Sequence, residues 1–144
     1  MAINTHIVIE KTGLQILAEH PEQFFLTGSR LFTPETAVLN GSDWDFYAPY
    51  SEDLMRDLIS KGFTVTAHEE SGYLDQSCVV IMEKDDVDVQ LRIHVDAYTK
   101  VCRYLCKHKV IASILFSKIR ESNNTIRTKV WNELLDAVTK GELE

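Results

Sequence analysis

The sequence predicts an α+β domain in which a mixed β-sheet is followed by a helical C-terminal section. The length of 144 residues is typical of one domain. Short apolar segments with strand-like spacing occupy the first two thirds of the chain, and from about residue 97 the apolar spacing becomes helical. We therefore expect residues 1–98 to form an α+β core with helices on one face of its sheet. Residues 99–144 are expected to form a helical section packed on the same domain.

The first elements follow from apolar spacing and from helix and turn signals. Apolar residues spaced through 5–20 predict an amphipathic helix, which Gly13 weakens and which ends before Pro21. The other elements expected before residue 50 are a buried strand over 24–26, a helix starting at Thr33-Pro34-Glu35, a turn at Asn40-Gly41 and a strand over 43–48.

The clearest strand pattern in the chain covers residues 87–95. Val87, Val89, Leu91, Ile93 and Val95 take one face of this strand, and Asp88, Gln90, Arg92 and His94 take the other. The remaining elements expected are a helix capped by Ser51 with a stripe of Leu54, Leu58 and Ile59, strands over 63–66 and 77–82, a turn over 83–86, and two or three helices over 98–116 and 125–138 with a break at 122–124.

The charge of the chain is divided unevenly along its length. The overall balance is 15 basic against 22 acidic residues, which disfavours a protein that wraps long nucleic acid. Residues 1–99 carry a net charge of −11, whereas residues 100–144 carry +4. An anionic substrate or acidic partner is therefore expected at the helical section, although a solvated surface explains either part alone.

The cysteine content and the apolar segments favour a cytoplasmic location. Three cysteines, Cys78, Cys102 and Cys106, are an odd number, and the N-terminus has no signal-peptide pattern. The apolar run over 110–116 is too short to cross a membrane. Cys102, Cys106 and the nearby His108 could contribute to a metal site, but core thiols are the favoured interpretation.

Two short motifs carry residue types that suit the binding of a metal–triphosphate. Gly28 and Ser29 follow a predicted strand, where a glycine allows close approach of phosphate, Ser29 offers a hydroxyl and Arg30 offers a positive charge. Asp43 and Asp45 are two residues apart, so a strand places both carboxylates on one face. Such carboxylates repel each other unless a cation lies between them, and oxygen ligands suit Mg²⁺. Alternatively, one of the two aspartates simply caps a turn.

A third motif lies on the strand predicted over 87–95. Asp88 stands between Val87 and Val89 on the polar face, with Arg92 and His94 on the same face. Either basic residue could contact phosphate or base, or could instead form a salt bridge with the acidic face. Taken alone, Asp88 is better explained as a solvent-facing residue beside an acidic turn, but the order and spacing of the three motifs favour a site.

The segments FFLTGSR, GSDWDF and VDV together resemble the DNA polymerase β-type nucleotidyltransferase superfamily, and in particular its small stand-alone members, the minimal nucleotidyltransferases. The resemblance covers about residues 5–95. It implies a nucleotidyltransferase-like core in which Gly28 and Ser29 bind the outer phosphates of the nucleotide. Arg30 and Arg92 are added as nucleotide-binding candidates because of their charge and their positions. The resemblance also implies that Asp43, Asp45 and Asp88 hold two Mg²⁺ ions, for which Mn²⁺ can substitute, and that Asp88 helps to activate the attacking hydroxyl.

The sequence departs from the small members in one place. Where they commonly have a further glycine after Gly-Ser-Arg, this chain has Leu31-Phe32-Thr33-Pro34, so the outer edge of the pocket differs. Arg103 and His108 match the R-x4-H string of HEPN ribonuclease toxins, the usual partners of minimal nucleotidyltransferases. The section after the sheet is too short for that four-helix domain, and the match is interpreted as coincidence.

The resemblance implies an enzyme that transfers a nucleoside monophosphate from ATP or another NTP to an acceptor hydroxyl on a protein, a small molecule or an RNA end. A protein acceptor in a toxin–antitoxin setting is the first expectation from the small members. The alternative is a catalytically weak or inactive binding module of the same fold that acts through a protein partner. The three aspartates favour the enzyme, because a pure binding module has no physical reason to keep repelling carboxylates.

Overall fold

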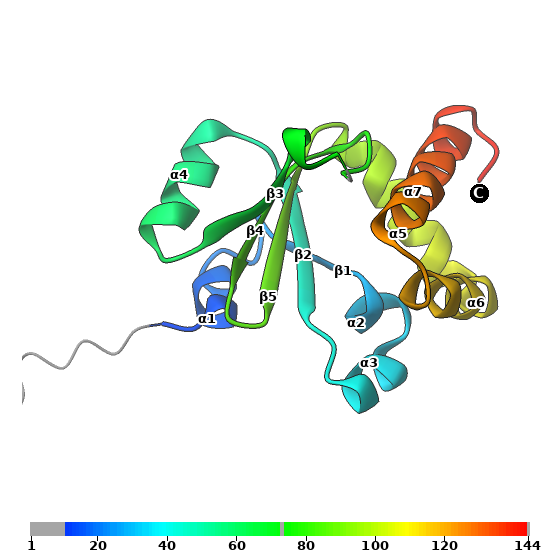
Figure 1. The fold of residues 1–144 in the computed structure, drawn as a ribbon, viewed down its shortest axis with the longest axis horizontal. Coiled ribbons are helices and arrows are strands. Elements are labelled where there is room, and N and C mark those ends of the chain that lie inside the picture. Colours follow the sequence, from blue (N-terminus) through cyan, green and yellow to red (C-terminus); the bar gives the residue numbers. More distant parts are fainter. Residues whose placement is uncertain (1–10, 73, 144) are drawn as a thin grey trace, which may run out of the picture.

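A five-stranded mixed sheet lies at the centre of the residues described by the computed structural model, 11–72 and 74–143 (Figure 1). The strands are β1 (Phe25–Thr27), β2 (Trp44–Pro49), β3 (Thr64–His68), β4 (Cys78–Lys84) and β5 (Val87–Arg92). They are ordered β1-β2-β5-β4-β3, with β2 and β5 parallel and the other neighbours antiparallel. The α+β fold with a mixed sheet and C-terminal helices is therefore confirmed.

The helices begin and end largely at the signals present in the sequence. They are α1 (Gly13–Ala18), α2 (Ser29–Phe32), α3 (Pro34–Asn40), α4 (Glu52–Ser60), the short 3-10 helix η1 (Glu69–Ser71), α5 (Val95–Lys107), α6 (Lys109–Arg120) and α7 (Asn124–Thr139). Of the helix expected over 5–20, α1 is observed, and residues 5–10 lie outside the described residues. Gly13 allows close packing rather than weakening α1, because an added Cβ would lie 2.7 Å from the carbonyl oxygen of Lys84.

The alternating pattern expected over 87–95 is confirmed through Arg92 and is wrong beyond it. Val87, Val89 and Leu91 are fully buried, but Ile93 is 44% exposed. The backbone N–H of Ile93 still donates to the carbonyl of Ser77, but His94 then adopts a left-handed conformation with a φ of 52°, which ends the extended segment. The chain turns there into α5, which removes His94 from the face that carries Asp88.

Helices α1 and α4 cover one face of the sheet, and helices α5 to α7 lie on its other side together with α2 (Figure 1). The apolar face of the strands packs against α1 and α4, and its buried residues include Ile16, Leu17, Leu54, Leu58, Phe63, Met82, Val87, Val89 and Leu91. The second core joins the opposite face to the C-terminal helices, and its members are Phe32, Tyr47, Tyr98, Val101, Cys102, Leu105, Ala112, Phe116 and Leu135.

The cysteines are packed as apolar side chains. Burial raises the pKa of the Cys78 and Cys102 thiols to about 11, which keeps both protonated at neutral pH. Within the described residues no three His, Cys, Asp or Glu side chains are grouped as ligands of a metal ion, so the arrangement considered for Cys102, Cys106 and His108 is not formed. No helix in the same residues has the length and apolar character that a membrane crossing requires.

Candidate functional site

Two aspartates from distant parts of the chain face each other across the parallel pair β2–β5. Asp45 and Asp88 are register partners, and Thr27 of β1 is the partner of Asp45 on the other side. Because side chains alternate between the faces of a strand, Asp45 and Asp88 share the face opposite the Val87–Val89–Leu91 core. The strands thus bring together two of the three predicted motifs, separated by more than 40 residues in sequence.

The first motif is held directly against Asp45. Gly28 follows β1 with a φ of 71°, a conformation that favours glycine, and an added Cβ would lie 2.3 Å from Asp45 Oδ2. The backbone then turns into α2, which has four residues and begins at Ser29. Glycine is therefore required at this position both by its backbone conformation and by the approach of the carboxylate.

Both carboxyl groups are harder to ionise than ordinary aspartates. Burial, followed by the charges of Asp88 and Asp43 and a hydrogen bond with Asp88, raises the pKa of Asp45 to about 7. Burial, followed by the charges of Glu83 and Asp43, raises the pKa of Asp88 to about 6, against which the hydrogen bond from Asp45 acts. Below a pH of about 7 Asp45 is therefore mostly protonated, and it shares this proton with the Asp88 carboxylate through their hydrogen bond.

The pair has features that fit a divalent cation. Asp88 Oδ1 is buried and has no hydrogen-bond partner among the described residues. A buried, unpaired carboxylate oxygen is costly, and a cation coordinated there would remove both this cost and the repulsion between the two groups. Asp43 lies just before β2 and is exposed, so it acts on the pair through its charge rather than through a hydrogen bond.

The structure gives Arg30 a role in holding the site together. Its Nε and one terminal nitrogen donate to the carbonyl of Ser42 at 2.9 Å and 2.6 Å, and its guanidinium lies 4.3 Å from the centre of the Trp44 ring. These contacts connect the start of α2 to the entry of β2. They fix the positions of Gly28 and Asp45 relative to each other, and they occupy the group that was predicted to bind the nucleotide.

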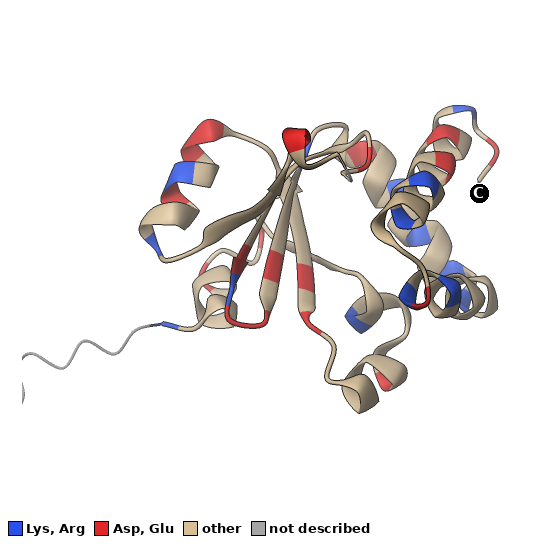
Figure 2. Cartoon of the chain, viewed as in Figure 1, with Lys and Arg blue, Asp and Glu red and all other residues tan. Residues whose placement is uncertain are grey.

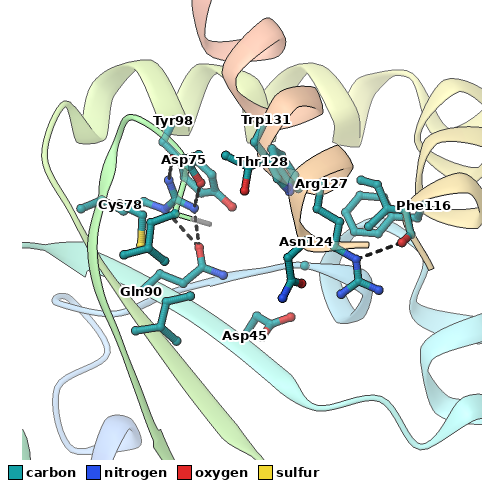
Figure 3. A pocket seen from close by; sticks show the side chains of 15 residues that line it. Asp45, Asp75, Cys78, Gln90, Tyr98, Phe116, Asn124, Arg127, Thr128 and Trp131 are labelled. Carbon is teal, nitrogen blue, oxygen red and sulfur yellow. Dashed lines mark hydrogen bonds and ion pairs between the residues drawn. The ribbon is translucent and has the colours of Figure 1, made fainter. Parts of the chain in front are cut away.

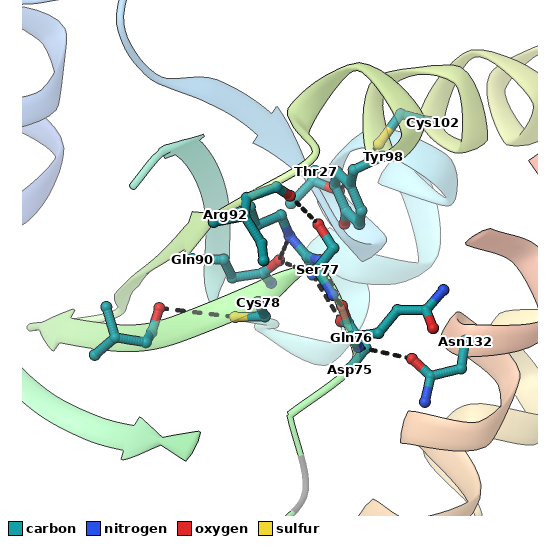
Figure 4. A network of polar contacts seen from close by, with 12 residues as sticks. Thr27, Asp75, Gln76, Ser77, Cys78, Gln90, Arg92, Tyr98, Cys102 and Asn132 are labelled. Carbon is teal, nitrogen blue, oxygen red and sulfur yellow. Dashed lines mark hydrogen bonds and ion pairs between the residues drawn. The ribbon is translucent and has the colours of Figure 1, made fainter. Parts of the chain in front are cut away.

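Arg92 is buried in a polar network beside the site (Figure 4). It is 3% exposed and makes a two-point ion pair with Asp75, at 2.8 Å and 3.0 Å. It also donates twice to Gln90 Oε1 and lies 3.6 Å from the centre of the Tyr98 ring. Of the two interpretations of Arg92, the structure forms the salt bridge, with Asp75 as a partner that the sequence did not indicate.

Next to the aspartate pair lies a cleft of about 260 Å³ between the sheet and the C-terminal helices (Figure 3). Gly28 and Asp45 line it from the sheet side. From α7, Asn124 and Arg127 extend toward the side on which Asp45 lies. The remaining lining residues are Leu74, Asp75, Cys78, Ile81, Gln90, Arg92, Tyr98, Phe116, Ile119, Thr128 and Trp131.

The α7 side of the cleft was missed by the sequence analysis because nothing in the pattern of α7 distinguishes Asn124 and Arg127 from surface residues of a helix. The only indication was the net charge of +4 over residues 100–144. Figure 2 shows the basic residues concentrated on α5 to α7, whereas acidic residues lie on the central strands. His94 stands apart from the aspartates, in the wall of another cavity with Gln76 and Asp136.

Comparison with protein families, with curated proteins and with solved structures gives no match for this chain.

The raised pKa values predict how stability depends on pH. A carboxyl group with a higher pKa in the folded than in the unfolded state binds protons more tightly when folded, so stability falls as pH rises from about 4 through the folded values of about 6 and 7. Asp45→Asn keeps an N–H donor facing Asp88 and removes one charge. Without divalent cations, we expect it to stabilise the protein by roughly 1–3 kcal/mol at pH 8 and by less at pH 5.

Urea unfolding in EDTA at pH 5 and pH 8 measures this difference. Asp86→Asn, an exposed carboxylate in the β4–β5 turn, is the control and should show little effect at either pH. A stability gain for Asp45→Asn that is equal at both pH values would contradict the shared-proton description.

Proposed function

We propose that this chain is a metal-dependent nucleotidyltransferase of the polymerase β-type fold, which transfers a nucleoside monophosphate from an NTP to an acceptor hydroxyl. One observation carries the proposal: Gly28 lies against Asp45, Asp45 is the register partner of Asp88, and Asp88 has a buried carboxylate oxygen without a hydrogen-bond partner among the described residues. Repelling carboxylates destabilise an empty site, and a cation with a phosphate ligand offsets that cost.

Each group has a distinct part in the proposed reaction. The turn at Gly28 and Ser29 would lie beside the outer phosphates, because the missing side chain lets this turn pack directly against the Asp45 carboxylate, a proposed metal ligand. Asp45 and Asp88 would hold Mg²⁺, or Mn²⁺ in its place. The resemblance adds Asp43 as a third ligand and a second ion, whereas the described residues do not group the three carboxylates as ligands of one metal centre. When bound, these ions supply charge stabilisation for the attacking and leaving oxygens of an in-line displacement. Asp88, as a carboxylate, accepts the proton of the attacking hydroxyl.

The reaction exchanges a phosphoanhydride bond for a phosphoester bond. The acceptor oxygen forms a bond to the α-phosphorus, the bond between that phosphorus and the bridging oxygen breaks, and pyrophosphate leaves. The net charge of −11 over residues 1–99 disfavours a long polynucleotide as acceptor. We therefore favour a protein side chain as acceptor, as the resemblance to toxin–antitoxin members implies, over a small molecule or an RNA end.

Thermal unfolding with each of the four common NTPs tests the proposal. In Mg²⁺ or Mn²⁺, at least one NTP should raise the melting temperature by several degrees at saturating concentration, and EDTA should abolish the rise. The double variant Asp43→Ala/Asp45→Ala should show no rise. If no NTP stabilises the wild type in either cation, the enzyme proposal fails and the binding-module alternative takes its place.

A further inference from the structure

A nucleotide in this cleft brings a phosphate chain of several negative charges next to carboxylates, so the cleft needs a positive side chain of its own. Both arginines that the sequence assigns to this task are engaged elsewhere. Arg30 is bonded to the Ser42 carbonyl and stacked on Trp44, and Arg92 is paired with Asp75. The cation that faces the nucleotide must therefore come from another element.

Arg127 meets this requirement from the opposite wall of the cleft. Its Nε donates to the carbonyl of Ile119 at 3.0 Å, which anchors the guanidinium against the C-terminal end of α6. In Figure 3 the terminal nitrogens extend beyond this bond into the cleft, on the side where Asp45 lies. The side chain is half-buried, and the bond to Ile119 holds its Nε in place.

Asn124 stands beside Arg127 on the same face of α7. The two residues are three apart, a spacing that makes them neighbours on a helix surface, and both line the cleft. Asn124 extends toward Asp45 in Figure 3 and adds an amide that can donate hydrogen bonds. A guanidinium whose terminal nitrogens extend into the cleft and an adjacent amide form a donor group suited to phosphate oxygens.

We propose that Arg127, with Asn124 beside it, binds the phosphate chain of the NTP across the cleft from Asp45. This inference rests on the proposed function and assigns the cation of its substrate site to α7. The C-terminal helices then belong to the active site rather than simply covering the sheet. The substrate is held between the carboxylate pair on the strands and the guanidinium on the helix.

Arg127→Ala should weaken binding of the Mg–NTP complex by about 10- to 100-fold, the effect of losing a charge-assisted hydrogen bond. The affinity for Mg–tripolyphosphate should fall by a similar factor, because the lost contact is to phosphate. Arg120→Ala is the matched control, since Arg120 Nε also donates to a helical carbonyl, that of Phe116, but the residue is exposed and outside the cleft lining. Its dissociation constants should stay within about twofold of the wild type.

Isothermal titration with the NTP that stabilises the wild type separates the outcomes. If Arg127→Ala binds the NTP with unchanged affinity, the inference is wrong and the proposed function is unaffected. The same holds if NTP binding becomes weaker but tripolyphosphate binding does not. An equal loss in Arg120→Ala also overturns it. If Arg127→Ala does not fold, Arg127→Lys is used instead, because it retains the positive charge. We expect its affinity for the NTP to fall by less than tenfold and its binding of tripolyphosphate to be retained. No NTP binding by the wild type instead refutes the proposed function.

Discussion

Asp45→Asn should lower the rate of nucleotidyl transfer by at least on the order of 10²–10³-fold while leaving the protein folded. Asp45 is the member of the carboxylate pair that touches Gly28 and lines the cleft, so it lies closest to where the phosphates are expected. The substitution keeps the size of the side chain but removes the negative charge that a metal ion requires. Transfer of label from an α-³²P-labelled NTP to acceptor, under single-turnover conditions, measures the loss.

Two controls make this result specific to the site. Asp86→Asn removes a carboxylate in the exposed turn beside β5 and should retain nearly full activity. Urea unfolding of Asp45→Asn in EDTA should show a protein at least as stable as the wild type, so that loss of activity cannot be assigned to unfolding. Equal label transfer by Asp45→Asn and wild type would exclude the aspartate pair as the catalytic centre.

Asp75→Ala should destabilise the protein by about 3–5 kcal/mol, because it leaves the Arg92 guanidinium buried without its counter-charge. Asp75 and Arg92 are only 8% and 3% exposed, and the Asp75 carboxylate also accepts from the backbone N–H of Ser77. The loss is measured as the change in the free energy of unfolding in urea at pH 7.

An exposed ion pair of similar length is the control for Asp75→Ala. Lys61 and Asp57 lie 2.9 Å apart on the end of α4, against 2.8 Å for the buried pair. Asp57→Ala should cost only about 0–1 kcal/mol, because water screens both charges. If the two alanine variants lose equal stability, burial of the Arg92 charge is not the cause.

Most of the fold could be predicted because local signals in this chain agree with its tertiary structure. Ser51 caps α4 as expected, Pro34 occupies the first turn of α3, and Gly41 ends that helix in a left-handed conformation. Local signals could not predict which strands pair. The segments around residues 45 and 88 contain no signal that they are neighbours, because the parallel β2–β5 contact depends on the packing of the whole sheet.

The candidate site was likewise predictable in part. The three motifs could be found in sequence because their spacing is unusual, and the structure brings Gly28, Asp45 and Asp88 together. The roles of Arg30 and Arg92 could not be predicted, because an arginine in a short helix or at the end of a strand is compatible with either a ligand contact or an internal contact. The partner Asp75 lies 17 residues from Arg92, in a segment without regular structure.

The β2–β5 pairing also determines when during folding the site comes into existence. Segment 25–49 contains the adjoining strands β1 and β2, and segment 64–92 contains β3, β4 and β5, each adjacent to the next in sequence and in the sheet. Contacts within each segment close short loops, whereas β2 meets β5 only after a much longer one has closed. Asp45 lies on β2 and Asp88 on β5, so neither segment alone contains the carboxylate pair. A ligand that binds both aspartates would therefore stabilise the contact between β2 and β5, which closes the longest loop of the sheet.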